Sequence, residues 1–147
     1  MNNPSLHSSR FFLKNSVTKA EKLIRRKGGI VTPGKIIAEQ SFGFWTSLFE
    51  THHYRLIGGI VIHAFPHKPA NINRNILSQK LNRIREFRNR IYHNEPICFN
   101  GNNIDFTEAK NIKIEVYELL IWIDADLTEY VEYFNGIDTK ISMVNNI

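Results

Sequence analysis

The 147-residue chain lacks several features that would place it in a special class of protein. Its single cysteine, Cys98, excludes an internal disulfide and a cysteine-based zinc site. No apolar run reaches the roughly 18 residues of a membrane-spanning helix, and the longest one, 56–65, contains two glycines and a histidine. The first residues lack the basic start and the apolar core of a signal peptide. We therefore expect a soluble, cytoplasmic protein with no membrane partner.

Acidic residues are scarce early in the chain, and basic residues are scarce late in it. Eight lysines and arginines stand against one acid over 10–35, and seven stand against one acid over 68–90. Over 105–138 the sign reverses, with nine acids against two lysines. A basic region of this kind suits a polyanion such as RNA. The alternative is that the two halves pair with each other, across the fold or across a dimer.

Hydrophobic residues recur at steps of three and four along most of the chain, which predicts an all-α protein. Capping residues set the boundaries: Gly28 ends the first helix, Thr32 and Pro33 begin the second, and Asn71 or Asn73 caps a long one. The predicted helices cover 16–27, 32–51, 54–64, 73–93 and 105–134, with a strand as the alternative for 54–64.

These elements predict one bundle of four to five helices over residues 16–136. The length of the chain fits one domain with a substantial core. Residues 1–15 are expected to form an irregular arm, and residues 137–147 a poorly ordered tail.

A cation and an imidazole lie five positions apart near the end of the helix predicted over 73–93. Arg88 keeps its charge at any usable pH and presents a planar fork that matches phosphate oxygens. His93 has the one side chain whose unperturbed pKa lies near neutrality. Together they supply an anion clamp and a proton-transfer group, which suffices for metal-free phosphodiester chemistry.

The same residues also have a purely structural interpretation. Arg88 can pair with an acid of the last helix, and His93 can stabilise a helix C-terminus through the macrodipole. A step of five residues turns a helix by about 140°, whereas Asn89 and His93 share one face. A single chain therefore separates Arg88 from His93, and two copies that meet can complete one cleft.

Two segments resemble a known family. Residues 81–97, LNRIREFRNRIYHNEPI, resemble the Abi-like (abortive infection) branch of the HEPN superfamily, whose signature is Arg-Asn-x-x-x-His. Residues 37–49, IAEQSFGFWTSLF, are similar to the Ser-Phe-Gly-Phe-Trp helix of that branch. The resemblance covers residues 5 to 135. The chain departs from it in a shorter N-terminal portion, in Asn94 where a second histidine is frequent, and in Glu95 where some HEPN subfamilies have a tyrosine.

The resemblance implies a HEPN-like bundle that dimerises with its motifs facing each other. It implies a metal-independent endoribonuclease of an abortive-infection or toxin system, without a cofactor and with an antitoxin protein as a further partner. Arg88 and His93 are then catalytic, and Asn89 orients His93 or binds phosphate. Three more arginines would bind RNA phosphates, and three neighbours of His93 would support the site; these are Arg83, Arg85 and Arg90, and Tyr92, Asn94 and Glu95.

Other interpretations stay open. The same fold can serve in phage defence as a non-catalytic module that binds RNA or protein. Glu95 can bond an arginine or a backbone group instead of acting in catalysis, and Tyr92 fits the core or an interface. A metal site is not expected at His52, His53, His63 and His67, because adjacent histidines point to different helix faces and no cysteine joins them. The aromatic stripe around Trp45 is expected in the core.

Overall fold

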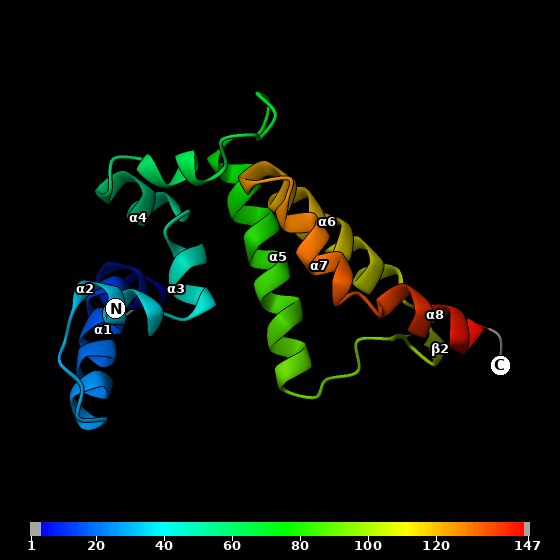
Figure 1. Cartoon of the computed structure of the whole chain (residues 1–147), viewed down its shortest axis with the longest axis horizontal. Helices are drawn as coiled ribbons and strands as arrows, with labels where there is room; N and C mark the ends of the chain where they lie inside the picture. Colours follow the sequence, from blue (N-terminus) through cyan, green and yellow to red (C-terminus); the bar gives the residue numbers. More distant parts are fainter. Residues whose placement is uncertain (1–3, 146–147) are drawn as a thin grey trace. The chain divides into compact units, whose positions relative to one another are not determined.

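The computed structural model describes residues 4–145, and the side chains of residues 11–144. In that range the chain is mostly helical, which confirms the all-α prediction (Figure 1). Between residues 4 and 145 it has eight α-helices, one 3-10 helix and one two-stranded sheet, instead of four or five helices. None of the helices between residues 4 and 145 combines the length and the apolar character needed to cross a membrane. The elements are α1 (Pro4–Arg26), α2 (Pro33–Ala38), α3 (Phe42–Ser47), α4 (Thr51–Leu56), η1 (Ile60–Ala64), α5 (Arg74–Tyr92), β1 (Phe99–Asn100), β2 (Asn103–Ile104), α6 (Thr107–Ile123), α7 (Leu127–Tyr133) and α8 (Ile137–Asn145).

The chain forms two compact units, one up to residue 61 and one from residue 62, where the sequence predicted a single bundle. In the first unit α1 contacts α2 and α4. Ala20 and Ile24 of α1 are buried, as is Phe49. The predicted stop at Gly28 is confirmed: the residue has a φ of 73°, and its N–H donates to the carbonyl of Arg25.

The helix predicted over 32–51 is broken into α2 and α3, and α4 begins at its last residue, Thr51. Thr32 caps α2 as predicted, because its hydroxyl accepts a hydrogen bond from the backbone of Lys35 at 3.4 Å. Ser41 caps α3 in the same way, accepting from Phe44 at 3.3 Å. A serine that caps a new helix competes with continuation of the old one, which explains the break.

The element predicted over 54–64 is also shorter than expected. Helix α4 ends at Leu56, and Gly58 and Gly59 follow with φ values of 65° and 74°. Glycine reaches such angles without steric cost, so the chain turns there and continues as η1. The strand alternative for this segment is therefore wrong.

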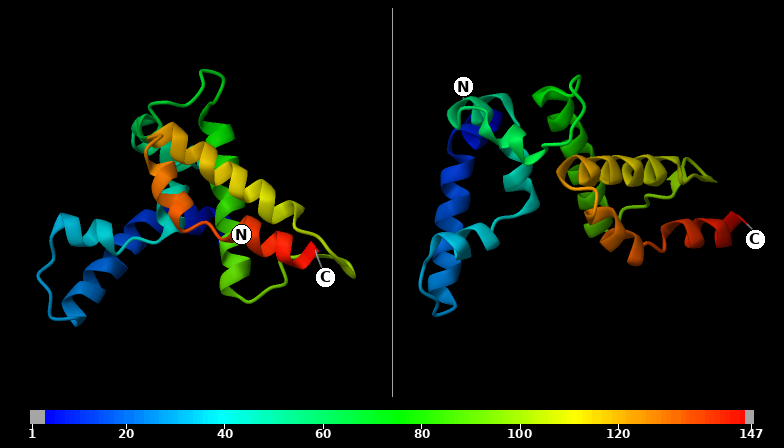
Figure 2. Two further views of the ribbon diagram at one scale, coloured as in Figure 1. Left: turned by 45° about the vertical axis from the view of Figure 1, so that its right-hand side comes forward. Right: turned by 45° about the horizontal axis from the view of Figure 1, so that its top comes forward.

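The second unit is built on α5 and α6, which run in opposite directions and are joined through the β1–β2 hairpin (Figure 2). Asn73 caps α5, with its side-chain oxygen accepting from the backbone of Asn75 at 2.9 Å and of Ile76 at 3.1 Å. The two helices bury Leu77, Leu81, Phe87, Leu119 and Trp122, and Phe65 and Ile141 are buried in the same unit.

The predicted helix 105–134 breaks at Asp124, whose backbone is extended and whose carboxylate accepts from the N–H of Asp126 at 3.0 Å. Helix α7 then packs against α6.

The prediction of a poorly ordered tail over 137–147 is wrong for 137–145, because these residues form α8 with Ile141 buried. The irregular arm predicted over 1–15 is likewise wrong from Pro4 onward, since proline suits a first helical turn. Residues 1–3 and 146–147 of those two predictions lie outside the described part of the chain.

Candidate functional site

The candidate residues lie on the last turns of α5, on the side away from the core. Leu77, Leu81 and Phe87 face inward and are buried. Arg88, Asn89 and His93 are exposed, as their positions between the apolar residues dictate. The apolar stripe predicted for this helix is therefore buried at Leu77, Leu81 and Phe87, but its last member, Ile91, is exposed.

Arg88 has an aromatic neighbour instead of a carboxylate. Its guanidinium carbon lies 4.3 Å from the centre of the Tyr92 ring, one helical turn further on. That distance is within the range of a cation–π contact. Among residues 11–144, no carboxylate oxygen comes within 4 Å of the Arg88 guanidinium, so the predicted alternative of an ion pair with the last helix is absent from this part of the chain.

Asn89 lies between Arg88 and His93 and contacts both. Its side-chain oxygen accepts from Nη1 of Arg88 at 3.5 Å, the outer limit of a hydrogen bond. Its backbone oxygen accepts from the backbone N–H of His93 at 2.9 Å. The Asn89 side chain therefore orients the arginine, while the backbone of the same residue fixes where His93 stands.

His93 is the residue that ends α5. Its φ of −89° and ψ of 8° depart from the helix, and its imidazole is exposed to solvent. The imidazole is therefore open to a ligand from solvent.

Asn94 and Glu95 close the helix with a pair of backbone hydrogen bonds. Asn94 has a φ of 55° and donates to the carbonyl of Ile91 at 3.0 Å, and Glu95 donates to that of Arg90 at 3.0 Å. This is the Schellman arrangement, in which asparagine accepts the left-handed conformation more readily than most residues. Asn94 thus holds the backbone beside His93, a role that the sequence did not predict.

Arg83 and Arg90, two of the predicted phosphate-binding residues, are paired with carboxylates of α6. Nε of Arg83 lies 3.0 Å from Glu115, and Nη1 of Arg90 lies 2.7 Å from Glu108. The hydrogen bond that Arg83 donates to Glu115 raises the pKa of the guanidinium further above its usual range. These two arginines hold α5 against α6, and a phosphate would have to displace a carboxylate from each.

Arg90 also binds the loop that follows α5. It donates to the carbonyl of Pro96 at 3.2 Å, and its Nε lies 3.4 Å from the Glu95 carboxylate. The alternative that Glu95 bonds an arginine is therefore confirmed. Arg85, the third predicted phosphate ligand, is half-buried.

The structure also places Tyr92, the aromatic stripe around Trp45, and His53. Tyr92 does not belong to the core, since 70% of it is exposed. The aromatic stripe around Trp45 is only partly in the core: Phe49 is buried, but Trp45 is exposed. His53 is buried, and its Nδ1 lies 2.9 Å from the carbonyl oxygen of Ser47.

Two cavities in the second unit were not predicted. A polar groove of about 730 Å³ runs between α5 and α6, and the paired residues Arg83, Glu108 and Glu115 line it. An apolar cavity of about 520 Å³ lies where α5, α6, α7 and α8 meet, with Phe87 and Ile141 in its wall. Both depend on the register of α5 against α6, which no local pattern in the sequence reveals. The Arg88–Tyr92 contact, by contrast, follows from a step of four on one helix.

In comparisons with known proteins, no family model matches the chain, and no curated protein or solved structure matches it significantly.

Proposed function

We propose that the chain is a metal-independent endoribonuclease of the abortive-infection or toxin type, with a HEPN-like bundle and with Arg88 and His93 as its catalytic residues. The observation that carries the proposal is the contrast among the arginines of α5. Arg83 and Arg90 are engaged by carboxylates, whereas Arg88 is held over Tyr92 with its charge available to an incoming anion. Five residues further on, His93 presents an exposed imidazole.

The proposed reaction is a transesterification within the RNA. His93 removes the proton of a ribose 2′-hydroxyl, whose oxygen attacks the adjacent phosphorus. Arg88 neutralises the negative charge that grows on the phosphoryl oxygens. The bond to the 5′-oxygen breaks, and that oxygen takes a proton from an imidazolium. The products are a 2′,3′-cyclic phosphate and a 5′-hydroxyl.

A second copy of the chain is part of this proposal. Arg88, Asn89 and His93 are exposed, so one chain does not enclose the reacting phosphate. A homodimer that brings two α5 ends together excludes water from the site and strengthens its electrostatics. It also supplies two copies of His93, one as base and one as acid. An antitoxin protein that covers this surface would silence the enzyme.

The same exposure favours one alternative, a non-catalytic module that binds RNA or protein in phage defence. The two functions differ in what they require of the RNA. Catalysis needs the 2′-hydroxyl as nucleophile, whereas binding to phosphates does not.

The test uses the full chain, EDTA, and an RNA oligonucleotide that carries one 2′-deoxy substitution at its main cleavage position. Unmodified RNA should be cut to a product ending in a cyclic phosphate, and the substituted position should resist. Cleavage at the 2′-deoxy position, or a requirement for a divalent cation, would contradict the mechanism. RNA that is bound but never cut would favour the binding module.

A further inference from the structure

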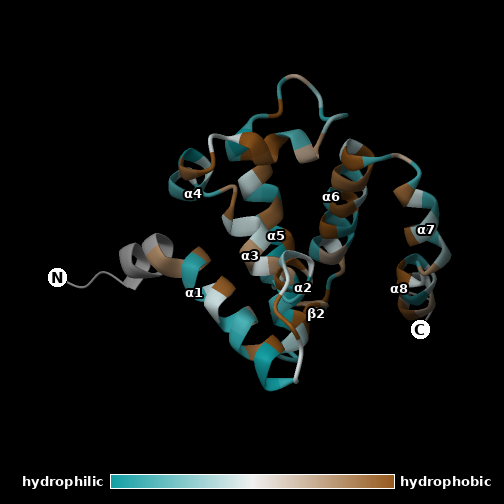
Figure 3. Cartoon of the chain, turned by 60° about the vertical axis from the view of Figure 1, so that its left-hand side comes forward, coloured by the Kyte–Doolittle hydropathy of each residue, from teal (hydrophilic) through white to brown (hydrophobic). Residues whose placement is uncertain are grey.

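The second half of α1 carries a row of cations that the structure does not neutralise. Lys14, Lys19, Lys22, Arg25 and Arg26 are all exposed. Between residues 11 and 144, no carboxylate lies within 4 Å of any of them; Lys27, at 2.9 Å from Glu39, is the basic residue of this stretch with an ion pair. Hydrophilic residues dominate this half of the helix (Figure 3).

Four cations of the second unit, by contrast, hold helices together through carboxylates. Lys80 and Arg83 pair with carboxylates of α6, Arg90 does so with Glu108, and Lys113 pairs with Asp138 of α8. The α1 cations named above have no such partner among residues 11–144, so ion pairs between helices do not account for them.

Helix stability does not explain the row either. Arg25 and Arg26 lie in the last turn, where cations favour the macrodipole. Lys19 and Lys22 lie further back, and each stands three or four positions from another cation, where like charges destabilise a helix. The stability of α1 therefore does not account for Lys19 and Lys22.

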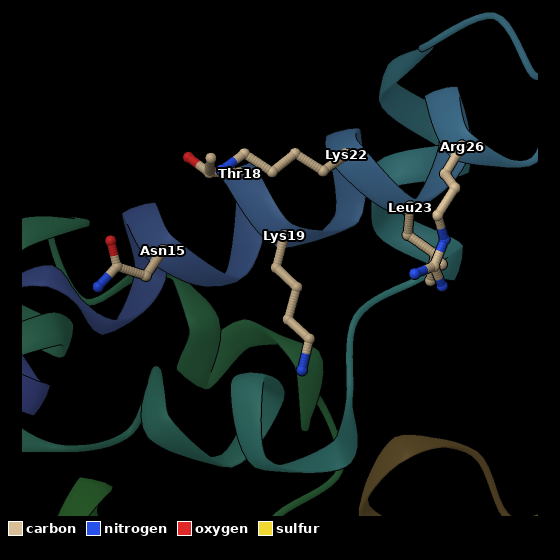
Figure 4. A pocket seen from close by; sticks show the side chains of 6 residues that line it. All are labelled: Asn15, Thr18, Lys19, Lys22, Leu23 and Arg26. Atoms are coloured by element: carbon tan, nitrogen blue, oxygen red, sulfur yellow. The ribbon is translucent and has the colours of Figure 1, made fainter.

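The geometry gathers part of the row on one face. Asn15, Thr18, Lys19, Lys22, Leu23 and Arg26 border a shallow hollow of about 410 Å³ along α1 (Figure 4). In that view Lys19 and Arg26 extend from the same side of the helix. From Lys19 to Arg26 the helix rises by about 10 Å, so the cations reach successive groups of an extended polyanion instead of converging on one ion.

We propose that this face of α1, which consists of Lys19, Lys22 and Arg26 with Asn15 and Thr18 beside them, binds the phosphate backbone of single-stranded RNA. Lysine and arginine supply the charge, and the amide and hydroxyl supply neutral hydrogen bonds to phosphate oxygens. The face holds no aromatic ring on which a base could stack, so contacts with phosphates dominate the binding. RNA as the polyanion rests on the proposed function; the binding surface itself is independent of catalysis.

The test measures RNA binding by the full chain with His93→Ala, which prevents turnover. The variant Lys19→Gln/Lys22→Gln/Arg26→Gln is compared with Arg55→Gln/Lys110→Gln/Lys140→Gln, three exposed cations elsewhere in the chain. Both variants remove three charges. Glutamine matches lysine and arginine in helix propensity, so α1 is retained, and circular dichroism checks this. The probe is a labelled single-stranded RNA of mixed sequence, followed by anisotropy over a series of salt concentrations.

Loss of three phosphate contacts should lower the slope of log K against log salt by about 2. The α1 variant should show this lower slope together with a fall in affinity of at least tenfold at low salt. The control variant should keep most of the affinity and most of the salt slope of the parent chain. Equal losses in the two variants would overturn the proposal, because they would reflect net charge alone. Absence of RNA binding by the parent chain would overturn it as well.

Cleavage by the chain with His93 intact separates this proposal from the proposed function. If the α1 variant loses RNA binding but the chain never cuts RNA, the proposed binding surface is supported and the proposed RNase activity is wrong. If the chain cuts RNA and the α1 variant binds RNA as tightly as the parent chain, the RNase activity is supported and the proposed binding surface is wrong.

Discussion

Tyr92 is the residue that holds Arg88 in place, and it provides the sharpest test of the site at the scale of single residues. An exposed cation–π contact contributes about 0.5–1 kcal/mol. Tyr92→Phe keeps the ring and should cut RNA as the unaltered chain does, whereas Tyr92→Leu should lower kcat/KM about two- to fivefold. The loss should disappear when Arg88 is already alanine. A larger loss in Tyr92→Phe than in Tyr92→Leu would instead make the tyrosine hydroxyl a participant in the reaction.

The sequence predicted this site in part. The exposure of Arg88, Asn89 and His93 follows from the apolar stripe of α5, and so does the closeness of Asn89 to His93. The pairing of Arg83 and Arg90 with α6 does not follow, because it depends on which residues of two antiparallel helices stand opposite each other. A list of cations in a sequence cannot say which of them are already neutralised.

Helix boundaries at the scale of elements were predictable wherever one local signal dominates. Thr32 and Asn73 cap their helices because their side-chain oxygens accept backbone hydrogen bonds, and Gly28 ends α1 because it lacks a side chain and can adopt a positive φ. The breaks at Ser41 and Asp124 were missed because the apolar spacing continues across them. Helix α8 was missed because its stability comes from burial of Ile141 in the second unit and not from its own sequence.

Helix α7 is fastened to α6 by a hydrogen bond from the Tyr117 hydroxyl to the Glu132 carboxylate, and this bond predicts a pH dependence. It raises the pKa of Tyr117 to about 12 and lowers that of Glu132. A raised tyrosine pKa gives stability that is present below about pH 10 and lost as the pH rises toward 12. A lowered glutamate pKa gives stability that is present above about pH 4.5 and lost as the pH falls through the folded value.

Tyr117→Phe removes the hydroxyl and keeps the ring that Lys113 approaches at 5.4 Å. The difference in Tm between the unaltered chain and this variant should therefore be largest from about pH 5 to pH 9 and should shrink on both sides. A difference that stays constant from acid to alkaline pH would show that the hydroxyl does not act through this bond. Absorbance titration of the tyrosines should lose its most alkaline step in the variant.

At the scale of the whole molecule, the proposed dimer makes activity depend on both copies of His93. If one copy is the base and the other the acid, a mixed dimer with His93→Ala is inactive. With a tenfold excess of that variant and free exchange, the activity per unaltered chain should fall to about a tenth. An equal excess of His63→Ala, an exposed histidine outside α5, should leave it unchanged. Undiminished activity in the first mixture would mean that one His93 suffices.

The central claim is that Arg88 and His93 together make the chain an RNase, and RNA cleavage by matched variants tests it most directly. The rate in EDTA is compared for the unaltered chain, Arg88→Ala and His93→Ala, with the exposed residues Arg55→Ala and His63→Ala as controls. We predict that the unaltered chain and both controls cut RNA, and that each site variant, still folded, is slower by about 100-fold or more. Cleavage that survives in either site variant, or no cleavage by the unaltered chain as a dimer, would contradict the account.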